Sequence, residues 1–255
     1  MLSENIGDLY AFLCFLICWI GYTWFADHIR RREGNIMVAM HDVRVVWMER
    51  MLKREIRIGD VSIVSTLARS GNLFVTTSVF ILGGLVAIMG ALDKARSLVG
   101  EFALVVQASR EMWEIKILVL ILIFVYAFFK FVWSVRQFNF SLMLLGAAPL
   151  HDELDAPDRE TFPRRAARVI SLAVDSFSRG VRAYYFGLAA LGWFVHPWVL
   201  GLASIWVVIV LHRREFRSKT LRTLGASDGD PYRALSEDKE KGLAALAERE
   251  SPHDP

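Results

Sequence analysis

The stretch "AYYFGLAALGWFVHPWVLGLASIWVVIVLHRR", Ala183 to Arg214, decides how this chain is threaded. Its first 29 residues, 183–211, contain no Asp, Glu, Lys or Arg, and the pair His196-Pro197 divides them. A continuous helix over that length would measure about 43 Å, well beyond a hydrocarbon core of about 30 Å. Proline disfavours helical geometry in the residue before it and suits the first turn of a new helix. The stretch therefore predicts two short helices in a tight hairpin, flanked by Trp193 and Trp198 as interfacial tryptophans.

The rest of the chain contains three more apolar blocks. Of the 255 residues, 54% are hydrophobic and 22% are charged, so the two kinds must be segregated along the chain. The further blocks cover 9–26, 73–92 and 117–135, the last interrupted only by Lys130. Each is close to the roughly 20 residues that span a membrane. We therefore predict an all-α polytopic membrane protein with about five transmembrane helices, the first of which is retained because its leader "MLSENIGD" is acidic.

The distribution of charge predicts the orientation of the chain. Lys and Arg crowd the segments 28–69, 136–182 and 212–222, and such residues accumulate in cytoplasmic loops. The amino terminus should therefore face outward and the carboxyl terminus should be cytoplasmic. A re-entrant hairpin over 183–211, which does not reach the far surface, is the alternative, and it keeps the same sidedness.

Amphipathic helices are expected on the cytoplasmic face. In the first inner loop one helical stripe collects Ile36, Met40, Val43, Trp47 and Met51. Asp60 would cap a short helix over 61–70. In the second inner loop, 138–150 would lie at the interface and 164–182 has helical apolar spacing.

The order of a crossing, an inner loop with amphipathic helices and a second crossing occurs twice, at an offset of about 110 residues. The offset aligns His41-Asp42 with His151-Asp152 and Arg69 with Arg179, but few other identities accompany them. Parallel duplication and chance therefore both remain open. The helical transmembrane domain should cover 1–218, and the polar residues 219–255 should form a mostly disordered cytoplasmic tail.

No catalytic or metal-binding pattern stands out. The chain has no His-Glu-x-x-His helix, no glycine-rich phosphate loop with a lysine and no nucleophile elbow. Cys14 and Cys18 lie four residues apart in an apolar helix and are expected to pack as small hydrophobic residues. We therefore expect no enzyme activity, no cofactor and no metal. We also expect no nucleic acid partner, since the basic residues lie next to the apolar blocks.

Polar residues near the bilayer are the better pointers to function, because ionisable groups there are costly without a partner. The expected cluster at the inner surface, which could bind an anion or a lipid headgroup, consists of Arg69, Asn72, Lys130, Arg136, Gln137, Asp175, Arg179, Arg182 and Tyr184. For the arginines, snorkelling to lipid phosphate is the competing interpretation. A second expectation is a ridge of small residues suited to close helix packing, formed by Gly83, Ala87 and Ala91.

At "ARSGNLFVTTSVF", "FVWSVRQFNF" and "SRGVRAYYFGLAAL" the chain resembles a family of bacterial and plant integral membrane proteins known as a domain of unknown function, number five-nine-nine. The resemblance runs over about residues 5–218 and omits the tail. It implies a multi-helix membrane protein, with the bacterial inner membrane as the expected location. It implies no activity, substrate or cofactor, so no functional residue is carried over.

These observations favour a structural or scaffolding membrane protein. Its basic inner face would bind anionic lipid headgroups or a partner membrane protein, and a homo-oligomer is also open. A small anion or solute transporter or channel is the alternative. Five helices leave little room for a pore, so that reading would require protomers to associate.

Overall fold

The computed structural model describes residues 2–29, 36–100, 108–149 and 156–216, and every regular element in these residues is a helix. The elements are α1 (Leu2–Ile29), α2 (Ile36–Leu52), α3 (Ile58–Gly90), α4 (Leu92–Gly100), α5 (Arg110–Gly146), α6 (Ala156–Leu191), the 3-10 turn η1 (Gly192–Phe194) and α7 (Pro197–Phe216). The predicted tail 219–255 and the pair His151-Asp152 lie outside the described residues.

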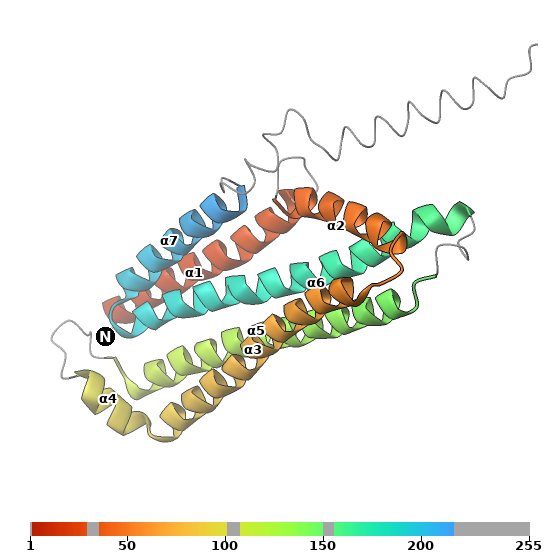
Figure 1. Cartoon of the computed structure of the whole chain (residues 1–255). Coiled ribbons are helices and arrows are strands. Elements are labelled where there is room, and N and C mark those ends of the chain that lie inside the picture. The colour runs from red at the N-terminus through yellow and green to blue at the C-terminus, as the bar shows by residue number, and fades with distance from the viewer. Residues whose placement is uncertain (1, 30–35, 101–107, 150–155, 217–255) are drawn as a thin grey trace, which may run out of the picture.

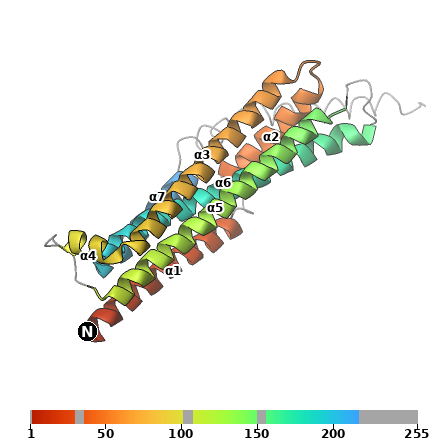
Figure 2. The same cartoon turned by 90° about the horizontal axis from the view of Figure 1, so that it is seen from below.

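The helices form an elongated bundle (Figure 1). In this view α7 and α1 lie next to α6, and α3 and α5 lie on the other side of α6. α4 lies at the end of the bundle that holds the amino terminus, and α2 lies at the opposite end, as the second view also shows (Figure 2). The most extensive helix contacts are those of α5 with α6 and with α3, and α7 packs more extensively on α1 than on α6.

Among the described residues, three helices are long and apolar enough to cross a membrane: Ile6–His28, Ile58–Gly90 and Arg110–Gly146. The described part of the chain is thus all-helical and of membrane type. α5 and α6, with 37 and 36 residues, are each about 55 Å long and exceed a hydrocarbon core of about 30 Å.

This length corrects two sequence predictions. The short helix expected over 61–70 is the first part of α3, and the interfacial segment expected over 138–150 is largely the last part of α5. Helical geometry continues because no proline lies within 58–146, and α5 ends at Gly146, shortly before Pro149. The amphipathic segment 164–182 is likewise continuous with the apolar residues that follow it in α6.

The helix breaks at the predicted proline. α6 ends at Leu191, η1 follows, and Pro197 is the first residue of α7. The imidazole Nδ1 of His196 accepts a hydrogen bond from the backbone N–H of Trp198 at 3.2 Å, so it satisfies one of the free amides of the new helix. Trp198 is 76% exposed, but Trp193 is buried and does not face the surroundings.

Two clusters of buried side chains hold the bundle together. The membrane core lies among the apolar blocks, and its largest fully buried side chains include Phe15, Ile117, Leu120, Ile123, Phe131, Phe186 and Leu200. The projecting core joins α2 to the start of α3, the end of α5 and the start of α6, and it includes Met48, Met51, Val64, Phe138, Leu145, Ala166, Ala167 and Ile170. One bundle therefore contains two cores, stacked along its axis.

α2 packs on α6 through a face that only partly matches the predicted stripe. Met51 of that stripe is buried and Trp47 packs against the projecting core, but Arg44 and Met48, which lie outside the stripe, are also buried. Asp60 is not an N-cap, since Arg57 occupies that position. The buried Asp60 carboxylate instead accepts hydrogen bonds from Trp47 Nε1 at 2.7 Å and from Arg54 Nη1 at 2.6 Å.

Candidate functional site

Charged side chains from three helices meet where the apolar blocks end. We call this group the arginine cluster; it consists of Tyr22 and Asp27 of α1, Arg179 and Arg182 of α6, and Glu215 of α7. Arg182 Nε donates to Glu215 Oε1 at 2.9 Å, and Arg182 Nη1 lies 3.4 Å from Asp27 Oδ1. The side chain of Arg182 is only 4% exposed, so its charge is neutralised inside the bundle.

The other members complete the network. Arg179 Nη2 lies 2.9 Å from Asp27 Oδ2, and the Tyr22 hydroxyl donates to Glu215 Oε2 at 3.0 Å. The Arg182 guanidinium also lies over the Tyr22 ring, 5.8 Å from its centroid. Two carboxylates and two guanidiniums therefore balance in charge and join α1, α6 and α7.

A second polar group lies at the opposite end of the membrane core. This lysine cluster consists of Asp8 of α1, Lys116 of α5 and Trp193 of η1. Lys116 Nζ donates to the Trp193 carbonyl oxygen at 2.9 Å and lies 3.4 Å from Asp8 Oδ1. The Trp193 indole N–H donates to the same carboxylate oxygen at 2.5 Å. The turn between α6 and α7 is thereby tied to the second turns of α1 and α5.

The two clusters are about one bilayer core apart. Asp8 and Asp27 are separated by 27 − 8 = 19 residues of α1, which is about 28 Å of helix. Aromatic rings occupy the space between them: the centroids of Phe15 and Phe186 are 5.9 Å apart, and those of Trp19 and Tyr126 are 5.8 Å apart. Charged groups thus lie at the two ends of the membrane core, with packed rings between them.

The structure brings only some of the predicted site residues together. Arg179 and Arg182 lie in the arginine cluster, and Lys130, whose ammonium lies 5.3 Å from the centroid of the Tyr126 ring, is close enough to Arg179 and Asp27 to interact electrostatically. Arg69, Asn72 and Arg136 are exposed on the outside of α3 and α5. The Arg136 guanidinium lies over Trp133 and Phe140 of its own helix.

Two further predicted residues bridge helices. Gln137 Oε1 accepts a hydrogen bond from Ser176 Oγ at 2.9 Å, which links α5 to α6. The Tyr184 hydroxyl lies 2.8 Å from Ser78 Oγ, which links α6 to α3. Both positions are structural contacts within the bundle.

Asp175 faces α2 and interacts electrostatically with His41 and Arg44. Ser171 Oγ lies 2.9 Å from His41 Nδ1 and accepts from Arg44 Nη1 at 3.1 Å. Burial lowers the pKa of His41 from its ordinary value, and Arg168 and Arg44 act in the same direction. Burial also lowers the pKa of Arg44. This part of the predicted cluster therefore belongs to the projecting core.

The predicted ridge of small residues lies on the outside of α3. Gly83, Ala87 and Ala91 are exposed, and a Cβ added at Gly83 would meet no atom within 4 Å. Close approach of helices occurs elsewhere, at Gly180, where an added Cβ would lie 2.6 Å from Cε1 of Phe131. Close packing of a helix on Gly83, Ala87 and Ala91 therefore stays a prediction, and that helix would belong to another molecule.

Sequence reasoning missed the acidic partners, which are Asp8, Asp27 and Glu215. Each lies next to the end of an apolar block, and that position was the available signal. The contacts of these acidic residues join positions up to 193 residues apart and are not visible in local sequence. Among the described residues, no group of three or more His, Cys, Asp or Glu side chains could hold a metal ion.

Comparison with known proteins gives one match. A family model described as "Protein of unknown function, DUF599" matches residues 10–220. No curated protein and no solved structure matches the chain. The family match covers all the helices from the tenth residue onward and both charged clusters apart from Asp8.

Proposed function

The chain belongs to the DUF599 family, and we propose that it is a non-enzymatic scaffold of the bacterial inner membrane whose basic inner face binds anionic lipid headgroups or a partner membrane protein. The single observation that carries this proposal is that the arginines near the ends of the apolar blocks are of two kinds: some are paired with carboxylates, and others are exposed. The buried Arg182 and the half-buried Arg179 are paired with carboxylates, whereas Arg69 and Arg136, near the ends of the apolar blocks 73–92 and 117–135, are exposed.

The lysine cluster supports five crossings over a re-entrant hairpin. Asp8 and Lys116 flank the outer ends of two apolar blocks, and Trp193, at the tip of the α6–α7 turn, contacts both. A turn that stopped within the bilayer could not reach residues at its far surface. The apolar residues 197–211 of the short α7 measure about 22 Å, less than a hydrocarbon core of about 30 Å, so this crossing requires local thinning of the bilayer or flanking side chains that reach the surface. The amino terminus faces outward and the carboxyl terminus is cytoplasmic in this arrangement.

The aromatic packing between the clusters favours a scaffold over a transporter. A path for ions through one protomer would need polar or water-filled space along the membrane core. Phe15, Phe186 and their neighbours fill that region instead. Transport thus remains the alternative only for an assembly in which several protomers form a path between them.

The exposed basic residues are suited to a negatively charged partner. Arg69 and Arg136 project from α3 and α5 near the ends of the apolar blocks 73–92 and 117–135. A basic side chain near an anionic membrane surface contributes about 1 kcal/mol of attraction. Anionic phospholipid headgroups and an acidic surface of another membrane protein both offer the matching charge.

Extraction into polymer-bounded membrane discs, followed by mass spectrometry of the lipids and proteins retained, tests the proposal. We expect enrichment of anionic lipid, or a specific partner, relative to the bulk membrane. The double variant R69Q/R136Q should lose this enrichment while it still inserts. Retention of bulk lipid composition with no partner, together with solute flux in proteoliposomes, would favour the transport alternative.

The predicted sidedness has its own test. A reporter that fluoresces only in the cytoplasm, fused after Pro255, should light up. A dark fusion with normal expression would contradict the proposed orientation.

A further inference from the structure

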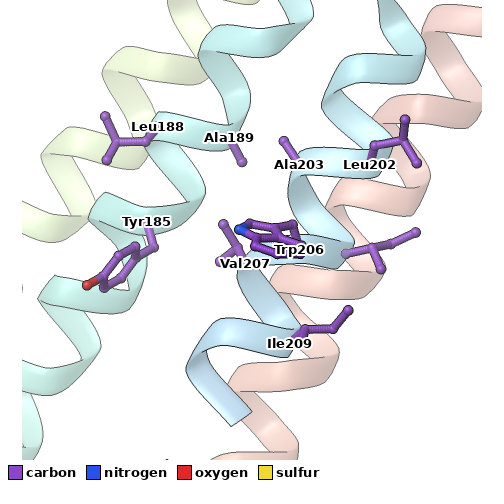
Figure 3. Close-up of a pocket in the computed structure, with 9 residues that line it drawn as sticks. Tyr185, Leu188, Ala189, Leu202, Ala203, Trp206, Val207 and Ile209 are labelled. Atoms are coloured by element: carbon purple, nitrogen blue, oxygen red, sulfur yellow. The ribbon is translucent and has the colours of Figure 1, made fainter. Parts of the chain in front are cut away.

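An open groove separates α6 from α7 on the outside of the bundle (Figure 3). It measures about 600 Å³ and is lined by Tyr185, Leu188, Ala189, Leu202, Ala203, Ile205, Trp206, Val207 and Ile209. Nearly all of this lining is apolar. The groove exists because small side chains, Ala189 and Ala203, lie on its two walls (Figure 3) and because α7 packs more extensively on α1 than on α6.

The groove has a cationic end. Tyr185 lines it on α6, and Arg214 Nη1 donates a hydrogen bond to the Tyr185 hydroxyl from the last turn of α7. Arg213 and Arg214 are both exposed there. This end lies next to Glu215, hence at the level of the arginine cluster, where the apolar stretch of α7 stops.

We propose that this groove is a binding site for one anionic phospholipid. One acyl chain lies between α6 and α7 against Trp206, which is 67% exposed, and the headgroup phosphate accepts hydrogen bonds from Arg213 and Arg214. The inference rests on the proposed function and specifies where on the basic face a lipid is held.

Charge complementarity selects lipid over a second copy of the chain. A second copy that placed a helix in the groove in the same orientation across the membrane would bring its own exposed Arg213 and Arg214 to the same level. Like charges would then face Arg213 and Arg214. An anionic lipid supplies both an apolar chain for the groove and a negative charge for its end.

A neighbouring groove provides an internal control. It lies between α1 and α7, measures about 360 Å³, and is lined by Gly7, Tyr10, Ala11, Cys14, Pro197, Trp198, Gly201, Leu202 and Ile205. It shares Leu202 and Ile205 with the first groove but does not include Tyr185, the lining residue to which Arg214 donates a hydrogen bond. It should therefore show no preference for anionic lipid.

Native mass spectrometry of the full chain in detergent tests the site. The probes are phosphatidylglycerol and phosphatidylcholine with identical acyl chains, and inorganic phosphate alone. The wild type should retain phosphatidylglycerol at least about fivefold better than phosphatidylcholine and should not retain phosphate, since each arginine near an anionic surface is worth about that factor. The double variant Arg213→Gln/Arg214→Gln should reduce the preference to about parity.

Filling the groove should remove both lipids. Ala203→Trp and, from the opposite wall, Leu188→Trp should lower retention of either lipid by about tenfold. Leu188 is exposed, so its replacement disturbs no buried contact and serves if Ala203→Trp folds poorly. Gly201→Trp in the neighbouring groove and Arg136→Gln on α5 should keep the wild-type preference.

Three results would overturn the site: equal retention of the two lipids by the wild type, unchanged retention in both groove-filling variants, or a dimer that replaces the lipid adduct and disappears in those variants. The proposed function is judged separately. If R69Q/R136Q still abolishes anionic enrichment in membrane discs while the groove variants have no effect, the groove assignment alone is wrong.

Discussion

The membrane core and the projecting core are built from different side chains on the same helices. The membrane core contains stacked aromatic rings such as Phe15, Phe131 and Phe186, with charged groups at its two ends. The projecting core is built around small residues and methionines such as Ala167 and Met48. In water the burial of apolar surface drives packing, whereas in lipid close packing and polar contacts between helices must do so. We expect the boundary between the two regimes to lie at the arginine cluster.

The largest expected effect is at this boundary. Arg182→Gln leaves Asp27 and Glu215 without their shared guanidinium, and loss of one partner from a buried ion pair costs about 3 to 5 kcal/mol. The thermal unfolding temperature of the detergent-solubilised protein should fall sharply. Arg69→Gln, at an exposed arginine, is the matched control and should change it little. Equal effects of the two variants would remove the distinction between buried and exposed arginines.

The next effect tests the aromatic packing. Gly180→Ala places a methyl group 2.6 Å from Cε1 of Phe131, and overpacking of this kind costs about 1 to 3 kcal/mol. Gly83→Ala adds the same methyl group in open space and should be neutral or slightly stabilising, because alanine favours a helix. Unfolding midpoints of the two variants check the difference. A harmless Gly180→Ala would mean that α5 and α6 are less closely packed.

A smaller effect is expected in the projecting core. Asp60→Asn replaces a charged acceptor of the Trp47 and Arg54 hydrogen bonds with a neutral one, which should cost about 1 kcal/mol. Hydrogen exchange should speed up in α2 and leave 117–135 unchanged. Asp93→Asn, at an exposed carboxylate on α4, is the control. Faster exchange throughout the bundle would show that the two cores do not open separately.

The smallest effect is a pH dependence of the same core. The folded pKa of His41 lies below its unfolded value of about 6.5, so the unfolded chain binds more protons in that range. Stability of α2 should therefore be full above that value and fall as pH drops below it. The charges near the imidazole are Asp42, Arg44, Arg168 and Asp175. Hydrogen exchange at pH 7.5 and 5.5 measures the fall, and His41→Gln should remove it.

Local sequence predicted the parts of this fold that depend on neighbours in the chain. The helix break at His196-Pro197 follows from the backbone geometry of proline, and the apolar blocks follow from their composition. The membership of Arg179 and Arg182 in a shared polar site was predictable because both adjoin an apolar block. Their partners, Asp27 and Glu215, were not, since helix order in the bundle decides which distant carboxylates meet them.

The buried face of α2 was predicted only in part. Met51 of the predicted stripe is buried and Trp47 packs against the projecting core, but the buried Met48 and Arg44 were not included in the stripe. Arg44 is buried because Ser171 accepts a hydrogen bond from its guanidinium, and a hydrophobic stripe does not predict such a polar tertiary contact.

The boundary along α3 offers the most direct test, because this one helix contributes to both cores. Spin labels at the exposed positions Ser62, Thr66, Val79 and Val86 would be introduced singly, after Cys14 and Cys18 are replaced by alanine. In liposomes we predict that labels at 79 and 86 collide with oxygen dissolved in lipid, and that labels at 62 and 66 collide with a water-soluble nickel reagent. Labels at 62 and 66 that are shielded from the nickel reagent and accessible to oxygen would contradict the division of the bundle into a membrane core and a projecting core.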